Sequence, residues 1–170
     1  MITGSLWATL ENSTLGSTIA SNEWMFPTIE TFHVIAIVTV IGVIAVMDLR
    51  LLGLTSGSKS IAAMERDTLP LTWIAFAIAV VTGTLLFVSK AQSYTVNPYF
   101  LWKLVFMALA GVNMVVFHRH FSKGIERWGV PGGAIPIGAK MSATLSLLLW
   151  MVIPFCGRIV GFTLGTYYAG

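Results

Sequence analysis

The sequence predicts an all-α integral membrane protein, a four-helix up-down bundle preceded by a short N-terminal interfacial helix. Hydrophobic residues make up 56% of the 170 residues and charged residues only 10%, against about 25% charged residues in an average soluble domain. The apolar residues also gather in four segments that reach the roughly 20 residues needed to cross a bilayer, approximately residues 27–54, 70–89, 98–121 and 138–162. Such segments cross as helices, because their backbone polar groups must be satisfied internally.

Residues 1–23 differ from the rest of the chain because they mix leucines with Ser, Thr, Asn and Glu11. This pattern is too polar to span and predicts a short helix lying on the membrane surface. A flexible tail is the alternative, since short helices are marginally stable in water. We therefore expect an interfacial segment, residues 1–23, and a four-helix domain, residues 24–170.

Proline opens three of the four apolar segments, at Pro27, Pro70 and Pro98. Proline is favoured in the first turn of a helix, where its missing N–H is no loss. Thr68 and Asn97 lie close to two of these starts, so we expect them to cap the helices.

The basic residues gather around two of the three connections, and this asymmetry predicts an orientation. Arg50, Lys59 and Arg66 flank the first connection, and Arg119, Lys123, Arg127 and Lys140 flank the third. By the positive-inside rule these connections are cytoplasmic, which makes both termini periplasmic in a bacterial inner membrane. The net charge of +3 is not concentrated on a basic face, so we expect no nucleic-acid partner.

Four ionisable residues fall at a similar depth on the periplasmic side of this topology, namely Glu30, His33, Lys103 and Arg158. Charges inside a membrane usually face one another or a cavity, so the four together predict a polar pocket. Glu30 and His33 are three residues apart and share a helical face. Taken singly, Lys103 and Arg158 are equally explained by snorkelling to the headgroups, and His33 by hydrogen-bonded packing.

The opposite side holds a second polar group, which includes Asp48, Arg50, His118 and His120. We interpret these residues mainly as anchors at the cytoplasmic interface, and their role stays open. His33 and His118 differ in depth by roughly 20 Å at 1.5 Å per residue, so they cannot ligate one iron within a subunit. A di-iron centre is disfavoured as well, because the sequence has a single Glu-x-x-His motif.

Several motifs carry a resemblance. The chain resembles an uncharacterised family of four-span bacterial inner-membrane proteins, and the motifs that match are Trp24-x-Phe-Pro, Glu30-x-x-His33, Asp48-Leu-Arg-Leu-Leu-Gly53, Asn97-Pro-x-Phe-x-x-Lys103 and Phe117-His118-Arg119. It is more distantly similar to membrane-type protoporphyrinogen oxidases that bind haem b and to the membrane domain of copper-resistance proteins. The similarity to the oxidases implies that His33 and Lys103 correspond to a functional histidine and lysine.

From the residues and this resemblance we predict a haem-b-binding membrane redox protein. His33 would be the axial and metal ligand, Lys103 and Arg158 would lie near carboxylates of the haem or a substrate, and Glu30 would orient the imidazole. The alternative is a non-enzymatic membrane subunit or a copper transport module, because the methionines, Met25 and Met107 among them, carry soft sulfur ligands. Whether the protein is an enzyme stays open.

Two kinds of partner follow from the composition. The apolar segments predict a lipid bilayer around the chain. Small residues such as Gly42, Gly111 and Gly157 permit close approach of another helix, so we expect a homo-oligomer or a larger membrane complex.

Overall fold

The computed structural model describes residues 2–55, 60–128 and 134–167, and these residues form helices and no strands. Lys59 and residues 168–170, which entered the predictions above, lie outside these ranges. In chain order the helices are α1 (Ile2–Glu11), α2 (Thr14–Ser21), α3 (Met25–Leu51), α4 (Ile61–Ser89), α5 (Ala91–Val96), α6 (Pro98–Val116), the π-helical turn η1 (Phe117–Phe121), the 3-10 turn η2 (Ile125–Arg127) and α7 (Ile137–Thr163).

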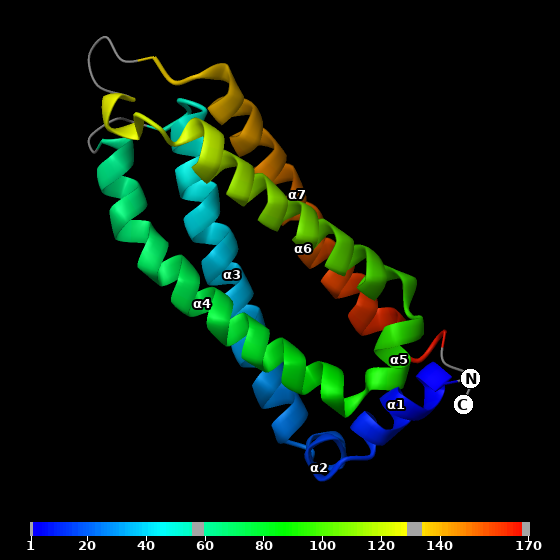
Figure 1. Ribbon diagram of the computed structural model, residues 1–170. Helices are drawn as coiled ribbons and strands as arrows, with labels where there is room; N and C mark the ends of the chain where they lie inside the picture. The colour runs from blue at the N-terminus through cyan, green and yellow to red at the C-terminus, as the bar shows by residue number, and fades with distance from the viewer. Residues whose placement is uncertain (1, 56–59, 129–133, 168–170) are drawn as a thin grey trace.

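Four of these helices are long and apolar enough to cross a membrane: α3, α4, α6 with η1, and α7. They run alternately up and down, as Figure 1 shows, which confirms the all-α four-helix bundle. Many of their large apolar side chains point outward, for example Val38 at 62% exposure, Ile74 at 60% and Met151 at 69%. Exposed apolar surface on this scale suits lipid rather than water, so the chain is a multi-pass membrane protein.

The helices pack unevenly. The α3 helix contacts α4 and α7, and α6 contacts α7, whereas the α4 and α6 ribbons stand apart along much of their length in Figure 1. The starts of α3 and α6 and the ends of α4 and α7 meet at one end, which α1, α2 and α5 cover. We name it the capped end. The opposite end, with residues 52–55, 60, 117–128 and 134–136, is the loop end.

The α4 helix begins at Ile61 rather than at Pro70. Ser60 caps it, because its side-chain oxygen accepts a hydrogen bond from the backbone N–H of Ala63 at 3.2 Å. The prediction that Thr68 caps this helix is therefore wrong, since Thr68 lies inside the helix and donates to the carbonyl of Met64 at 2.8 Å. Pro70 interrupts one backbone bond without ending a helix that was capped further upstream.

Asn97 holds two elements together at the capped end. Its side-chain oxygen accepts from the backbone N–H of Tyr99 and Phe100 at 3.0 and 3.3 Å, which confirms it as the cap of α6. Its side-chain nitrogen donates to the carbonyl and hydroxyl oxygens of Thr163 in α7 at 3.2 and 3.0 Å. Asn97 is fully buried, so its side-chain amide relies on these protein partners rather than on water for its hydrogen bonds.

The N-terminal helices contact the end of α4 and the start of α5. The Trp7 ring packs edge-on against Phe87, with centroids 5.6 Å apart. The Glu11 carboxylate accepts from the backbone N–H of Gln92 at 2.9 Å. The two short helices are thus tied to the bundle by specific contacts.

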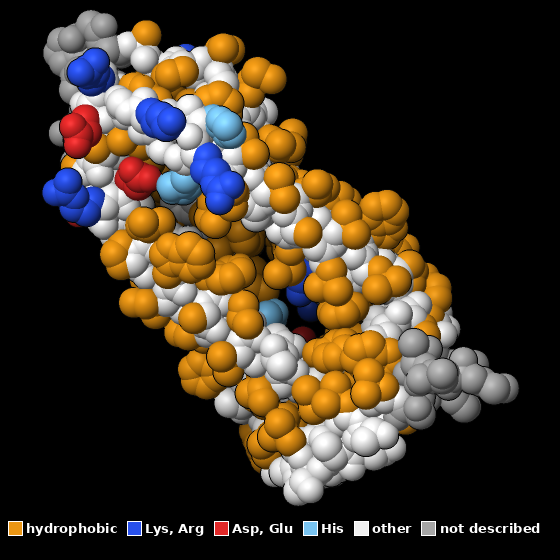
Figure 2. Space-filling view, in the orientation of Figure 1, with side chains coloured by type: hydrophobic (Ala, Val, Ile, Leu, Met, Phe, Trp, Pro, Cys, Tyr) orange, Lys and Arg blue, Asp and Glu red, His pale blue; other side chains and the backbone are white. Residues whose placement is uncertain are grey.

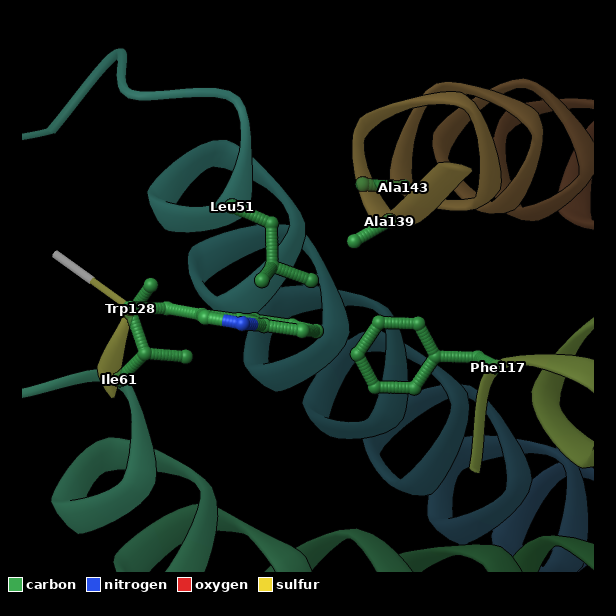
Figure 3. Packing of buried hydrophobic residues seen from close by; sticks show 6 residues of the cluster. All are labelled: Leu51, Ile61, Phe117, Trp128, Ala139 and Ala143. Atoms are coloured by element: carbon green, nitrogen blue, oxygen red, sulfur yellow. The ribbon is translucent and has the colours of Figure 1, made fainter. Parts of the chain in front are cut away.

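A compact apolar cluster closes the loop end. Phe117 and Trp128 meet edge to face there with centroids 6.3 Å apart, and Figure 3 shows both rings between α3, α4 and α7. The buried members are Leu51, Ile61, Phe117, Trp128, Ala139 and Ala143. This cluster packs the end of α3 against the starts of α4 and α7, close to the polar residues described next.

Candidate functional site

A hydrogen bond joins His33 of α3 to Thr82 of α4. The Nδ1 of His33 lies 2.9 Å from the hydroxyl oxygen of Thr82. Thr82 directs its only hydroxyl proton to the carbonyl of Ile78, 2.7 Å away, so its oxygen acts as the acceptor for His33. This arrangement assigns the proton of the neutral imidazole to Nδ1 and leaves a lone pair on Nε2, the form that ligates metals.

Gly83 makes room for that imidazole. A Cβ atom built at position 83 would lie 2.9 Å from Cε1 of His33, which is closer than carbon atoms approach in proteins. The Thr82-Gly83 pair therefore has two physical roles, because the first residue holds the ring and the second admits it. The sequence pattern alone indicated only that small and polar residues occur at this level.

Lys103 of α6 shares a pocket of about 60 Å³ with His33, which we name the His33 pocket. The Lys103 ammonium nitrogen would be 3.7 Å from a Cβ at Gly157, so the stem of Lys103 lies along α7. The rest of the lining is mostly apolar and includes Val40, Phe76 and Met107.

The other two predicted residues lie elsewhere. Arg158 is exposed, and its guanidinium stands 4.6 Å from the centre of the Phe162 ring. Glu30 is exposed as well. Burial, with a smaller contribution from the Glu30 carboxylate, raises the pKa of Tyr94 to about 12, which places Glu30 near α5. The hydrogen bond of His33 goes to Thr82 and not to Glu30, so the structure brings together two of the four residues.

A larger cavity of about 220 Å³ lies next to the His33 pocket, toward the loop end. We name it the Asp48 cavity. It shares four lining residues with the His33 pocket, namely Val40, Phe76, Met107 and Trp150. Figure 2 shows a hollow between α4 and α6, and the basic side chain visible at its depth belongs to no residue that lines the Asp48 cavity. Its polar lining consists of Asp48, Glu65, Thr68, Thr72, Asn113, His118, Ser142 and Ser146.

Sequence reasoning missed this cavity because it interpreted Asp48 and His118 as interfacial anchors. A signal was present, since Ser142, Ser146 and Trp150 recur every four residues on one face of α7. Arg50 and His120, grouped with them above, do not line the cavity. Arg50 is buried and donates to the carbonyl of Thr55 at 3.5 Å, and His120 is exposed.

Within the described residues, no group of three or more His, Cys, Asp and Glu side chains is placed to hold a metal ion. No family model, curated protein or solved structure matches the chain.

Proposed function

We propose that the chain is a haem-b-binding membrane redox protein in which His33 ligates the iron. The observation that supports this best is the Nε2 lone pair of His33, which the Thr82 hydrogen bond leaves available beside a cationic and otherwise apolar pocket. Haem carries four of its iron ligands itself, so one imidazole suffices. When bound, haem supplies one-electron chemistry.

The residues present fit haem by their chemistry. Lys103 offers a cation for a carboxylate side chain of haem, while Val40, Phe76 and Met107 offer apolar contact for the ring. The His33 pocket of about 60 Å³ is smaller than the roughly 300–1,000 Å³ of typical ligand sites. Even with the adjoining Asp48 cavity of about 220 Å³ the space reaches only about 280 Å³, so haem would require α4 and α6 to move apart beside the His33 pocket rather than occupy the Asp48 cavity.

The second candidate is a copper transport module or a non-enzymatic subunit. Met107 favours it, because this thioether lines both cavities and lies in the same pocket lining as His33. Thioether and imidazole together suit Cu(I). A copper site would, however, require further ligands from flexible side chains or from a second subunit.

The decisive experiment is an absorption spectrum of gently solubilised protein expressed with haem available. We expect a Soret band that His33→Ala removes and His118→Ala leaves in place. Thr82→Val should weaken haem binding by about 10–100-fold, as is typical for a group that orients a ligating histidine. Thr84→Val is the matched control, because Thr84 is exposed and its hydroxyl donates to the carbonyl of Val80 in its own helix.

Absence of a Soret band, or equal sensitivity to His33→Ala and His118→Ala, would refute the haem proposal. Copper retained by purified protein and lost in Met107→Leu would then support the transport reading. The two candidates are thus separated by one spectrum and one metal analysis.

For location, we infer a bacterial inner-membrane protein with both termini periplasmic, so that the His33 pocket lies on the periplasmic side. The distribution of Lys and Arg around the first and third connections supports this orientation. Alkaline phosphatase fused after Gly170 should be active. Fluorescence from a reporter that folds only in the cytoplasm, fused at the same position, would contradict the orientation.

We also propose that the chain forms a homo-oligomer or joins a larger membrane complex. A Cβ at Gly42 would meet nothing within 4 Å, so this position leaves room for another helix. The mass of the particle in mild detergent, measured at several concentrations, tests this. A monomer throughout would count against a homo-oligomer.

A further inference from the structure

The Asp48 cavity has a polar end and an apolar body. Asp48 lies in the last turn of α3, Glu65 in the second turn of α4 and His118 in η1, so these ionisable groups all belong to the loop end. Trp73 and Trp150 line the cavity nearer the middle of their helices. The cavity is therefore shaped for an amphiphile with its polar group toward the loop end.

The charges of the polar end are not balanced within the cavity. The Glu65 carboxylate has a partner, because its Oε1 lies 3.4 Å from Nε2 of His118. Asp48 shares the lining of the cavity with Ser146. Its Oδ2 is buried without a hydrogen-bond partner among the described residues, and Asp48 as a whole is only 7% exposed.

A buried carboxylate oxygen requires a proton donor or a cation as partner. The described lining of the cavity contains neither Lys nor Arg, and its histidine, His118, faces Glu65, so a ligand with a cationic head would supply the partner that Asp48 lacks. Four aromatic rings also belong to the lining, those of Trp73, Phe76, Phe117 and Trp150. Aromatic faces attract organic cations, most strongly when the cation is removed from water.

We infer that the Asp48 cavity is a binding site for a small amphiphilic organic cation, an amine or quaternary ammonium with an apolar body of about one ring. Asp48 is the counter-ion, and the aromatic lining contacts the body and the charged head. A volume of about 220 Å³ lies just below that of drug-sized sites, which sets this size limit. The hollow between α4 and α6 (Figure 2) offers entry from the lipid side.

This inference does not depend on haem, because Asp48 and His33 line different cavities. Loss of the haem spectrum in His33→Ala and loss of cation binding in Asp48→Asn are therefore separate results.

The test is isothermal titration of the full chain in nanodiscs with benzyltrimethylammonium. We expect saturable binding of one cation per chain. Neopentylbenzene has the same shape without the charge, so it should not compete at equal concentration. Asp48→Asn keeps the shape of the side chain and should weaken binding of the cation at least tenfold. Asp67→Asn is the control, because Asp67 is exposed and does not line the cavity.

A second variant tests the cavity without changing Asp48, in case Asp48→Asn does not fold. Gly111 lines the cavity and has open space beside it, so Gly111→Leu should fill the cavity and abolish binding with Asp48 intact. Gly161→Leu, at a position with open space that does not line the cavity, should bind normally. No saturable binding, equal binding of the neutral compound, or full binding by folded Asp48→Asn would overturn the inference.

Discussion

Gly83→Ala provides a quantitative test of the His33 geometry. The new methyl carbon would lie 2.9 Å from Cε1 of His33, against an optimal carbon separation of about 3.5–4.0 Å. The imidazole or α4 must therefore move by about 1 Å. Overpacking of this kind typically costs about 1–3 kcal/mol, and displacing the ring endangers its hydrogen bond to Thr82, worth about 0.5–1.5 kcal/mol.

The matched control is Gly42→Ala, where nothing lies within 4 Å of the new carbon. Both changes gain helix propensity, about 1 kcal/mol relative to Gly, so this gain cancels when the two variants are compared. We expect Gly83→Ala to be less stable than Gly42→Ala by about 1–3 kcal/mol. The assay is unfolding in mixed detergent and SDS micelles, followed by circular dichroism.

Removing the imidazole should remove the conflict. In a His33→Ala background the difference between Gly83→Ala and Gly42→Ala should fall close to zero, because the atom that meets the new methyl group is gone. This double-mutant cycle isolates the contact from other effects of each change. Equal stability of the two glycine variants, or a difference that persists without His33, would refute the geometry.

Three further predictions concern other parts of the bundle. Asn97→Ala should destabilise the fold by about 2–4 kcal/mol, because a helix cap and a buried amide are lost together; unchanged SDS unfolding would contradict this. Asn113 and Ser142, joined by bonds of 2.9 and 3.0 Å, should show a coupling of about 1 kcal/mol in a double-mutant cycle, and zero coupling would argue against the pair. Tyr94 should ionise at about pH 12 rather than 10.0 in ultraviolet titration. The free energy of unfolding should therefore fall as the pH rises from 10 to 12. Glu30→Gln should lower the pH at which half of Tyr94 is ionised.

The sequence was sufficient for the spanning helices because their apolar length is a local property. Asn97 was identified as a cap for the same reason, since the cap and the first turn are adjacent in the chain. The start of α4 was misplaced because the polar turns after Ser60 fall outside the apolar segment, although they continue the helix. Apolar length measures the membrane crossing and not the hydrogen-bonded helix.

The site could be predicted only in part from the sequence. The rise per residue gives the depth of a residue in the membrane, but not the rotation of its helix about the helix axis. Depth grouped His33, Lys103 and Arg158, yet Arg158 belongs to an exposed face of α7 while Lys103 lies along the face of α7 that carries Gly157. The Asp48 cavity was hidden for the same reason. It exists where one face of each of four helices meets, and these faces are known only once the helices are packed.

The contacts at the capped end set an order of assembly during synthesis. Trp7 and Glu11 are made before Phe87 and Gln92, which they contact, and the spanning helices α3 and α4 are made in the interval. At about 5–20 residues per second, this interval lasts on the order of several seconds. During that time α1 and α2 lack their contacts with α4 and α5, although they can already contact each other and α3. Docking of α1 and α2 onto α4 and α5 is thus a late folding step although both helices are made before the spanning helices.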